Sequence, residues 1–179
     1  MLLVFSGLPG TGKSTIAKRL ASELSATYVR VDEIESTLAQ GTSLGHDVGP
    51  AGYLVAFAIA RSNLICGNTV IADSVNPVPD SRQGWRSVAE AAGTSVLEIE
   101  VICSNEDEHR RRVMGRTPDV PGLALPTWEM VKARHYVPWT TDRLVIDTAL
   151  LGPDEASTQI LRHLDAIPRN PMAKMPGPT

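Results

Sequence analysis

The sequence contains little cysteine and no long apolar run, and each absence excludes a class of protein. Its 179 residues include two cysteines, Cys66 and Cys103, which lie far apart and form no C-x-x-C pair. A zinc site built mainly from thiolates is therefore excluded, and the four histidines show no metal-ligand spacing either. No run of 18 apolar residues is present, so the sequence predicts no transmembrane helix.

Signals for export or for nucleic-acid binding are also scarce. The first apolar run, Leu2–Phe5, is too short for a signal peptide and follows no basic segment. Both cysteines end apolar stretches, so we expect buried free thiols, which suit a reducing cytoplasm. Seventeen basic and 20 acidic residues give a net charge of -3, without general attraction for nucleic acid. We therefore predict a cytoplasmic monomer or homodimer that binds neither membrane nor nucleic acid.

What is present is an alternation of short β-rich runs and helical patterns. With 42% hydrophobic and 21% charged residues, the composition is that of a globular domain. The alternation predicts an α/β fold with a parallel sheet covered on both faces by helices. We expect five strands, at Leu2–Phe5, Thr27–Val31, Thr69–Ala72, Val96–Cys103 and Arg143–Ile146. We expect helices at Lys13–Leu24, 33–40, Ala51–Ile65, Asp80–Ala92, Asn105–Arg116, Trp128–Tyr136 (with Thr127 as N-cap) and Glu155–Ile167, followed by a flexible Pro-rich tail over 168–179.

A glycine-rich segment follows the first expected strand and opens the first expected helix. Residues 7–14, GLPGTGKS, match the pattern G-x-x-x-x-G-K-[ST] at every fixed position, in the context that forms a phosphate-binding loop. Glycines let backbone N–H groups turn toward phosphate oxygens, and the helix N-terminus adds its positive dipole end. We therefore predict that this segment binds ATP together with Mg²⁺.

Individual residues near this loop have separate expected roles. Lys13 would reach the β- and γ-phosphates, and the Ser14 hydroxyl would ligate Mg²⁺. Thr15 would donate to the α-phosphate, and Asp147, after the fifth expected strand, would support a base-binding loop. The remaining expected nucleotide contacts come from Gly7, Pro9, Gly10, Thr11, Gly12 and Arg112.

Two aspartates are expected at the carboxyl ends of strands, where open α/β sheets bind ligands. Asp73 closes the third expected strand and is a candidate Mg²⁺ ligand with Ser14, the alternative being a turn-capping role. Asp32 closes the second expected strand and is a candidate general base for an attacking hydroxyl. Asp32 and Glu35 also have the spacing of a capping box, which leaves a helix-capping role open for Asp32.

An arginine-rich segment lies between the fourth and fifth expected strands. Arg112 and Arg116 are four residues apart, and therefore on one face of an expected helix. Arginines bind phosphate through paired N–H groups and stabilise charge that spreads on a transferring phosphoryl group. With the Pro/Gly loop 117–126 and the helix after it, residues 105–135 are expected to form a mobile lid. A solvated charged helix is the alternative.

Together these features resemble the small P-loop kinases, a group of single-domain AAA-family ATPases related to chloramphenicol phosphotransferase, gluconate kinase, shikimate kinase and the kinase domain of polynucleotide kinase. The resemblance rests on the loop 7–14, Val31-Asp32, the run Val70–Asp73 and Arg112-x-x-x-Arg116, and it covers about residues 1–167. It implies a three-layer P-loop NTPase fold with a five-stranded parallel sheet in the order 2-3-1-4-5 and a helical lid. It further implies transfer of a phosphoryl group from ATP to a hydroxyl, with Asp32 as base and Arg112 and Arg116 as lid arginines.

Three functions are compatible with this pattern. A kinase acting on a small-molecule hydroxyl is favoured over a partner-driven ATPase or switch, because the sequence shows no additional C-terminal helical domain or second arginine sensor. It is favoured over a polynucleotide 5′-hydroxyl kinase because such kinases carry an arginine where this chain has Glu35. A second carboxylate near Asp32 favours a neutral or cationic acceptor. The helix Ala51–Ile65, with Tyr53 and Phe57, either walls a substrate pocket or belongs to the core.

Overall fold

The computed structural model describes residues 1–41 and 48–166. The expected tail and most of the expected loop 41–49 lie outside the described residues. Within them, parallel strands form one sheet in the order β2-β3-β1-β4-β5, which confirms the expected fold and strand order. The strands are β1 (Leu2–Ser6), β2 (Thr27–Arg30), β3 (Val70–Asp73), β4 (Val96–Ile102) and β5 (Leu144–Asp147).

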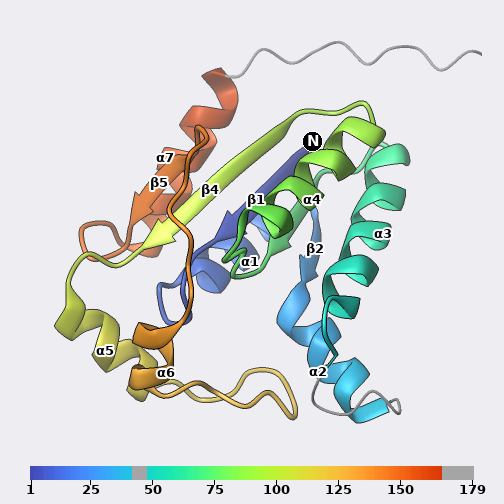
Figure 1. The fold of residues 1–179 in the computed structure, drawn as a ribbon. Helices are drawn as coiled ribbons and strands as arrows, with labels where there is room; N and C mark the ends of the chain where they lie inside the picture. Colours follow the sequence, from blue (N-terminus) through green and yellow to red (C-terminus); the bar gives the residue numbers. More distant parts are fainter. Residues whose placement is uncertain (42–47, 167–179) are drawn as a thin grey trace, which may run out of the picture.

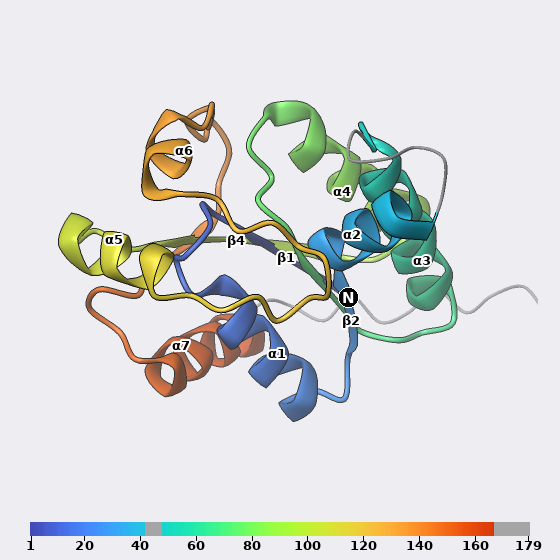
Figure 2. The same cartoon turned by 90° about the horizontal axis from the view of Figure 1, so that it is seen from below.

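Helices cover both faces of the sheet and extend past its carboxyl edge (Figures 1 and 2). One face packs against α1 (Lys13–Glu23) and α7 (Pro153–Ala166), and the other against α3 (Ala51–Ile65) and α4 (Pro79–Ala91). Beyond the carboxyl ends of the strands lie α2 (Val31–Gly41), α5 (Glu106–Met114) and α6 (Trp128–Ala133). None of the described helices is long and apolar enough to cross a bilayer.

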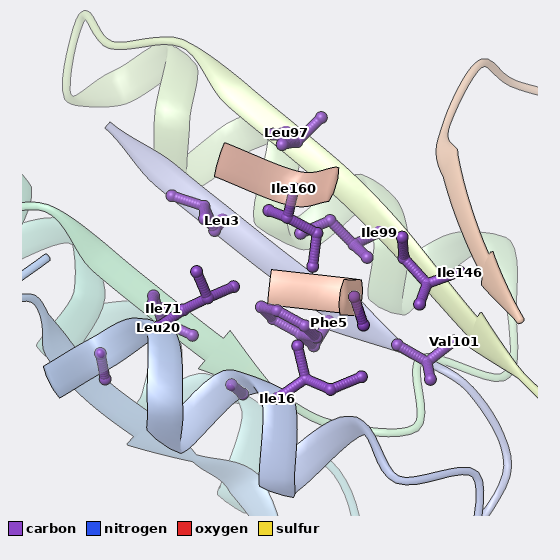
Figure 3. Close-up of a cluster of buried hydrophobic side chains, with 13 residues drawn as sticks. Leu3, Phe5, Ile16, Leu20, Ile71, Leu97, Ile99, Val101, Ile146 and Ile160 are labelled. Atoms are coloured by element: carbon purple, nitrogen blue, oxygen red, sulfur yellow. The ribbon is translucent and has the colours of Figure 1, made fainter. Parts of the chain in front are cut away.

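The core fixes the two elements that flank the glycine-rich loop. Side chains alternate across β1, so that Phe5 points toward α1 and α7, where it meets Ile16, Leu20 and Ile160 (Figure 3). All four are at most 1% exposed, and burying each such side chain stabilises the fold by about 1.5–3 kcal/mol. The carboxyl end of β1 and the first turn of α1 are thereby held in place.

Two boundaries differ from expectation in ways that bear on function. The expected helix Asn105–Arg116 ends at Met114, because Gly115 is its C-cap and Thr117, next to Pro118, resists helical conformation. Arg116 therefore lies beyond α5. The second helix starts at Val31 directly after β2, so Asp32 lies in its first turn, not at a strand end or capping position.

Smaller corrections concern α6 and the cysteines. Thr127 caps α6 as expected, but the helix ends at Ala133, three residues early. Arg82 explains this end, because it donates to the Val137 carbonyl (2.6 Å) and stacks on the Tyr136 ring, drawing the chain toward α4. The expectation of buried cysteines is wrong: Cys66 is exposed and Cys103 only partly buried, since each follows the last residue of its element.

Candidate active site

The glycine-rich loop between β1 and α1 adopts a backbone that side chains would not tolerate. Gly10 and Gly12 have φ values of 84° and 91°, a region that other residues rarely adopt. A Cβ on Gly10 would also lie 2.5 Å from Cγ2 of Val113. The loop therefore packs directly against α5, and Gly12 serves as N-cap of α1 without using a side chain.

Hydrogen bonds anchor this loop from two other elements. His109 Nε2, on α5, donates to the carbonyl of Pro9 at 2.8 Å. The Thr148 hydroxyl, after β5, lies 2.8 Å from the carbonyl of Thr11, and Arg112 Nη1 donates to the same hydroxyl at 2.8 Å. The loop is thus held from both sides, which limits the reorganisation needed when it binds phosphate.

Lys13 is a buried cation with no hydrogen-bond or ion-pair partner in the part of the chain that the structure describes. Only 5% of the residue is exposed, and among the described residues its ammonium group forms no hydrogen bond or ion pair. Burial lowers the pKa of Lys13, while the charges of Asp73 and Asp32 act in the opposite direction. A cation kept out of water in this way fits an anionic ligand such as phosphate.

Two adjoining cavities open beside the loop. The first, of about 360 Å³, is lined by the start of α1 from Gly12 to Thr15 and by Arg112, Arg116 and Asp119. The second, of about 440 Å³, shares Gly12, Thr15 and Arg112 with the first and extends along the segment Thr148–Pro153. Their arrangement suits a phosphate chain in the first cavity and a base in the second.

Asp147 stabilises the turn that borders the second cavity. Its Oδ1 accepts hydrogen bonds from the backbone N–H groups of Ser104 and Ala149, both at 3.0 Å. Burial acts to raise the pKa of Asp147, but these hydrogen bonds outweigh it and lower the pKa. The aspartate thus has the contacts that its expected loop-supporting role requires.

Both aspartates of the carboxyl edge lie beside Arg30, the last residue of β2. Asp73, 1% exposed, accepts a hydrogen bond from the Tyr28 hydroxyl at 2.6 Å, and its Oδ2 lies 3.9 Å from Arg30 Nε. Asp32 Oδ2 lies 3.7 Å from Arg30 Nη2. No group of three or more Asp, Glu, His or Cys side chains able to hold a metal occurs among residues 1–41 and 48–166. Oxygen donors as few as Ser14 and Asp73 fit Mg²⁺, which keeps several of its waters.

A third carboxyl group, Glu35, lies one turn beyond Asp32 against α3. A Cβ on Gly52 would lie 2.3 Å from Glu35 Cγ, so the missing side chain leaves the space that Glu35 fills. Burial raises the pKa of Glu35 to about 7, the charge of Asp32 adds to this, and Arg134 opposes it. Burial likewise raises the pKa of Tyr53 to about 12.

Of the two roles left open for helix α3, the structure supports packing in the core. The Phe57 ring meets that of Trp85, a fully buried side chain, at 4.6 Å between centroids, so Phe57 packs against the core. The Tyr53 hydroxyl accepts from the backbone N–H of Asn76 at 3.2 Å. The charges of Glu35 and Asp32 add to the rise in the pKa of Tyr53.

The structure brings Arg112 and Arg116 to the same cavity, although they do not share a helix. Arg112 is held by Glu108 (2.8 Å) and Thr148, while Arg116 Nη2 reaches Asp119 Oδ1 at 3.3 Å. Sequence reasoning missed Arg30, whose signal was a lone charge in an otherwise uncharged strand. It also missed Asp119, which carries no recognisable signal in a Pro/Gly loop.

Comparison with known proteins agrees with this geometry. Residues 2–136 match the family model described as an AAA domain. The chain belongs to this AAA domain family. This AAA domain protein is 30% identical over 156 residues to the probable adenylyl-sulfate kinase of Aeropyrum pernix, over 80% of each chain. It is 27% identical to the cytidylate kinase of Ignicoccus hospitalis, over 91% of this chain and 98% of the relative.

A solved structure shares the fold. The APS kinase of Mycobacterium tuberculosis, in complex with AMPPNP and APS, superposes with a TM-score of 0.66 at 21% identity, over 92% of this chain and 97% of that one. The AAA domain protein is thus an ATP-binding phosphotransferase of the P-loop kinase type.

Proposed function

We propose that the protein transfers the γ-phosphoryl group of ATP to a hydroxyl group of a small molecule, with Asp32 as general base. The observation that supports this most is the position of Asp32. Its carboxylate lies in the first turn after β2, 3.7 Å from Arg30 at the carboxyl edge of the sheet, and its charge acts to raise the pKa of Lys13. A hydroxyl between the phosphate cavity and Asp32 can therefore give up its proton while it attacks phosphorus.

The nucleotide side supplies positioning and charge. The backbone of the loop, from Gly7 and Pro9 through Gly10, Thr11 and Gly12, would surround the phosphates, and Thr15 would donate to the α-phosphate. Lys13, Arg112 and Arg116 would stabilise the charge that spreads over the transferring group. Ser14 and Asp73 would hold Mg²⁺, which neutralises charge on the β- and γ-oxygens when bound.

In the proposed transfer, each bond that forms is matched by a bond that breaks. The acceptor O–H bond breaks and its proton passes to the Asp32 carboxylate. The acceptor oxygen forms a bond to the γ-phosphorus, and the bond from this phosphorus to the β-bridging oxygen breaks, which leaves ADP. Closure of the segment 105–135 over the cavity, which Arg116 already lines, would exclude water, so that the phosphoryl group goes to the acceptor.

Phosphoryl transfer from γ-labelled ATP tests this proposal. The panel contains alcohols with and without anionic or amino groups, a nucleoside monophosphate, and 5′-hydroxyl oligonucleotides. We expect label on a small-molecule alcohol, and Asp32→Asn should slow that transfer about 10²–10⁴-fold while nucleotide affinity stays unchanged. Glu33→Gln, an exposed neighbour on the same helix, is the matched control.

Three results would contradict the proposal. Label on the oligonucleotide alone indicates a polynucleotide kinase. Label released only as inorganic phosphate indicates an ATPase without an acceptor of its own. Near-normal transfer by Asp32→Asn assigns Asp32 a structural role.

A further inference from the structure

One carboxylate in the loop between α5 and α6 is surrounded by cations from three parts of the chain. Asp119 lies 2.9 Å from Lys18 Nζ on α1 and 3.3 Å from Arg116 Nη2. It also accepts two hydrogen bonds from Arg30, Nη1 to Oδ2 at 2.7 Å and Nη2 to Oδ1 at 3.2 Å. Figure 2 shows this loop running from α5 across the ends of the strands toward α2 and back to α6.

The central cation of this cluster is buried. Arg30 is 3% exposed, and its Nε has no hydrogen-bond partner among the described residues. A buried guanidinium is costly unless an anion pairs with it. Asp119 is the anion that hydrogen-bonds to it, while the carboxylates of Asp32 (3.7 Å) and Asp73 (3.9 Å) lie farther away. The Asp119 side chain, 39% exposed, also lines the phosphate cavity.

A ligand can replace the charged contacts that attach the loop between α5 and α6. Besides Asp119, it is held to α2 through the carbonyl of Pro121, which accepts from Ser36 Oγ (2.7 Å) and Gln40 Nε2 (2.9 Å). Helix α2 and this loop therefore meet through polar contacts at the rim of the site. If the loop lifts, Lys18, Arg30 and Arg116 are left without their shared carboxylate, and a ligand anion can take its place.

We propose that Arg30, Lys18 and Arg116 form a binding site for an anionic group of the acceptor, a sulfate, phosphate or carboxylate, and that Asp119 occupies this site in the ligand-free protein. The inference rests on the proposed function, because it places the anion beside the general base. Arg30 Nη2 lies 3.7 Å from Asp32, and neither residue lines the cavities beside the glycine-rich loop, whereas Arg116 and Asp119 line the first of them.

The sequence predicts a neutral or cationic acceptor, because Glu35 lies near Asp32. The proposed anion site replaces that prediction with an acceptor that carries an anionic group. The pKa of Glu35 is raised to about 7 by burial, so near neutral pH the group carries only part of a negative charge. Arg30, in contrast, keeps its full positive charge at every pH. The structure therefore surrounds the acceptor with more positive charge than the sequence shows.

Sulfate titration of the protein saturated with the non-hydrolysable ATP analogue AMPPNP and Mg²⁺ tests the site, because the bound triphosphate occupies the glycine-rich loop together with the γ-phosphate position. Binding is followed by the shift in unfolding temperature at constant ionic strength, with chloride as balancing ion. Asp119→Asn should bind sulfate about tenfold more tightly than the wild type, since the internal competitor is gone. Adding Lys18→Gln should reverse most of that gain. Glu106→Gln, which breaks the exposed pair with Lys132 between α5 and α6, should leave sulfate affinity at the wild-type value.

Equal sulfate affinity of the wild type and Asp119→Asn would overturn the proposal, and so would a gain that survives Lys18→Gln. A gain seen only without AMPPNP would also overturn it, because Asp119 would then stand in for a phosphate of the nucleotide. ADP affinity is measured separately and reports on the proposed function. Failure of the anion site can therefore be told apart from failure of the proposed function.

Discussion

The two loops that border the phosphate cavity are held in opposite ways. The glycine-rich loop is fixed by close packing of Gly10 against Val113 and by neutral hydrogen bonds from His109 and Thr148. The loop 115–127 is held by the charges that meet at Asp119, together with burial of Val120 and hydrogen bonds to the Pro121 carbonyl. The first arrangement is prepared before any ligand arrives, whereas the second uses contacts that an anionic ligand can replace.

The difference has an energetic side. Neutral hydrogen bonds each contribute about 0.5–1.5 kcal/mol to stability. Exposed ion pairs such as Lys18–Asp119 contribute about 0–1 kcal/mol and are weakened by salt. The glycine-rich loop should therefore keep its conformation at high salt, while the loop 115–127 should open more often.

The largest expected effect on stability tests the packed loop. Gly10→Ala combines a strained φ of 84° with the contact at Val113 and should lower the free energy of unfolding by about 2–4 kcal/mol. Gly67 is a matched control, with a similar φ of 87° but nothing near its would-be Cβ, so Gly67→Ala should cost only about 1–2 kcal/mol. Urea unfolding measures both. Equal losses would show that close packing against α5 does not hold the loop.

A smaller effect on stability, dependent on pH, tests the charged groups around Asp32 and Glu35. Because the pKa of Glu35 is about 7 in the folded state and the reference value is 4.5, the folded protein keeps a proton that the unfolded chain loses as pH rises. Wild-type stability should therefore fall between about pH 4.5 and 7 and level off above this range. Glu35→Gln cannot ionise and should be more stable than the wild type at pH 8 by about 1–3 kcal/mol, with no difference near pH 4.

Thermal unfolding of Glu35→Gln across this pH range makes the comparison. The exposed Glu33→Gln, on the same helix, should follow the wild-type profile throughout. Parallel profiles for Glu35→Gln and the wild type would mean that Glu35 is well solvated in the folded protein.

The glycine-rich loop and the elements that flank it could also be predicted from the sequence. Apolar runs and the pattern at residues 7–14 predict β1, the loop and α1, because local sequence determines them. The cluster of charges around Asp119 depends on contacts between distant segments. Arg30 and Asp119 are separated by 89 positions, and neither periodicity nor a motif connects them.

The predicted ends of helices were wrong where tertiary contacts override local conformational preference. Asp32 enters α2 because the chain turns into a helix directly after Arg30, and α6 ends early because Arg82 holds the segment after it. Gly52 is a further example, since its missing side chain matters only once α2 and α3 are packed together. Sequence patterns therefore predict the nucleotide side of this site better than the acceptor side.

The most direct test of the central claim, that the preformed loop is the centre of phosphoryl transfer, is the rate of transfer from ATP by Lys13→Ala. Removing this cation should raise the activation barrier by about 3 kcal/mol, a loss of roughly 10²-fold or more, without unfolding the protein. Lys132→Ala, an exposed lysine on α6, should keep the wild-type rate. An undiminished rate in Lys13→Ala would contradict the account.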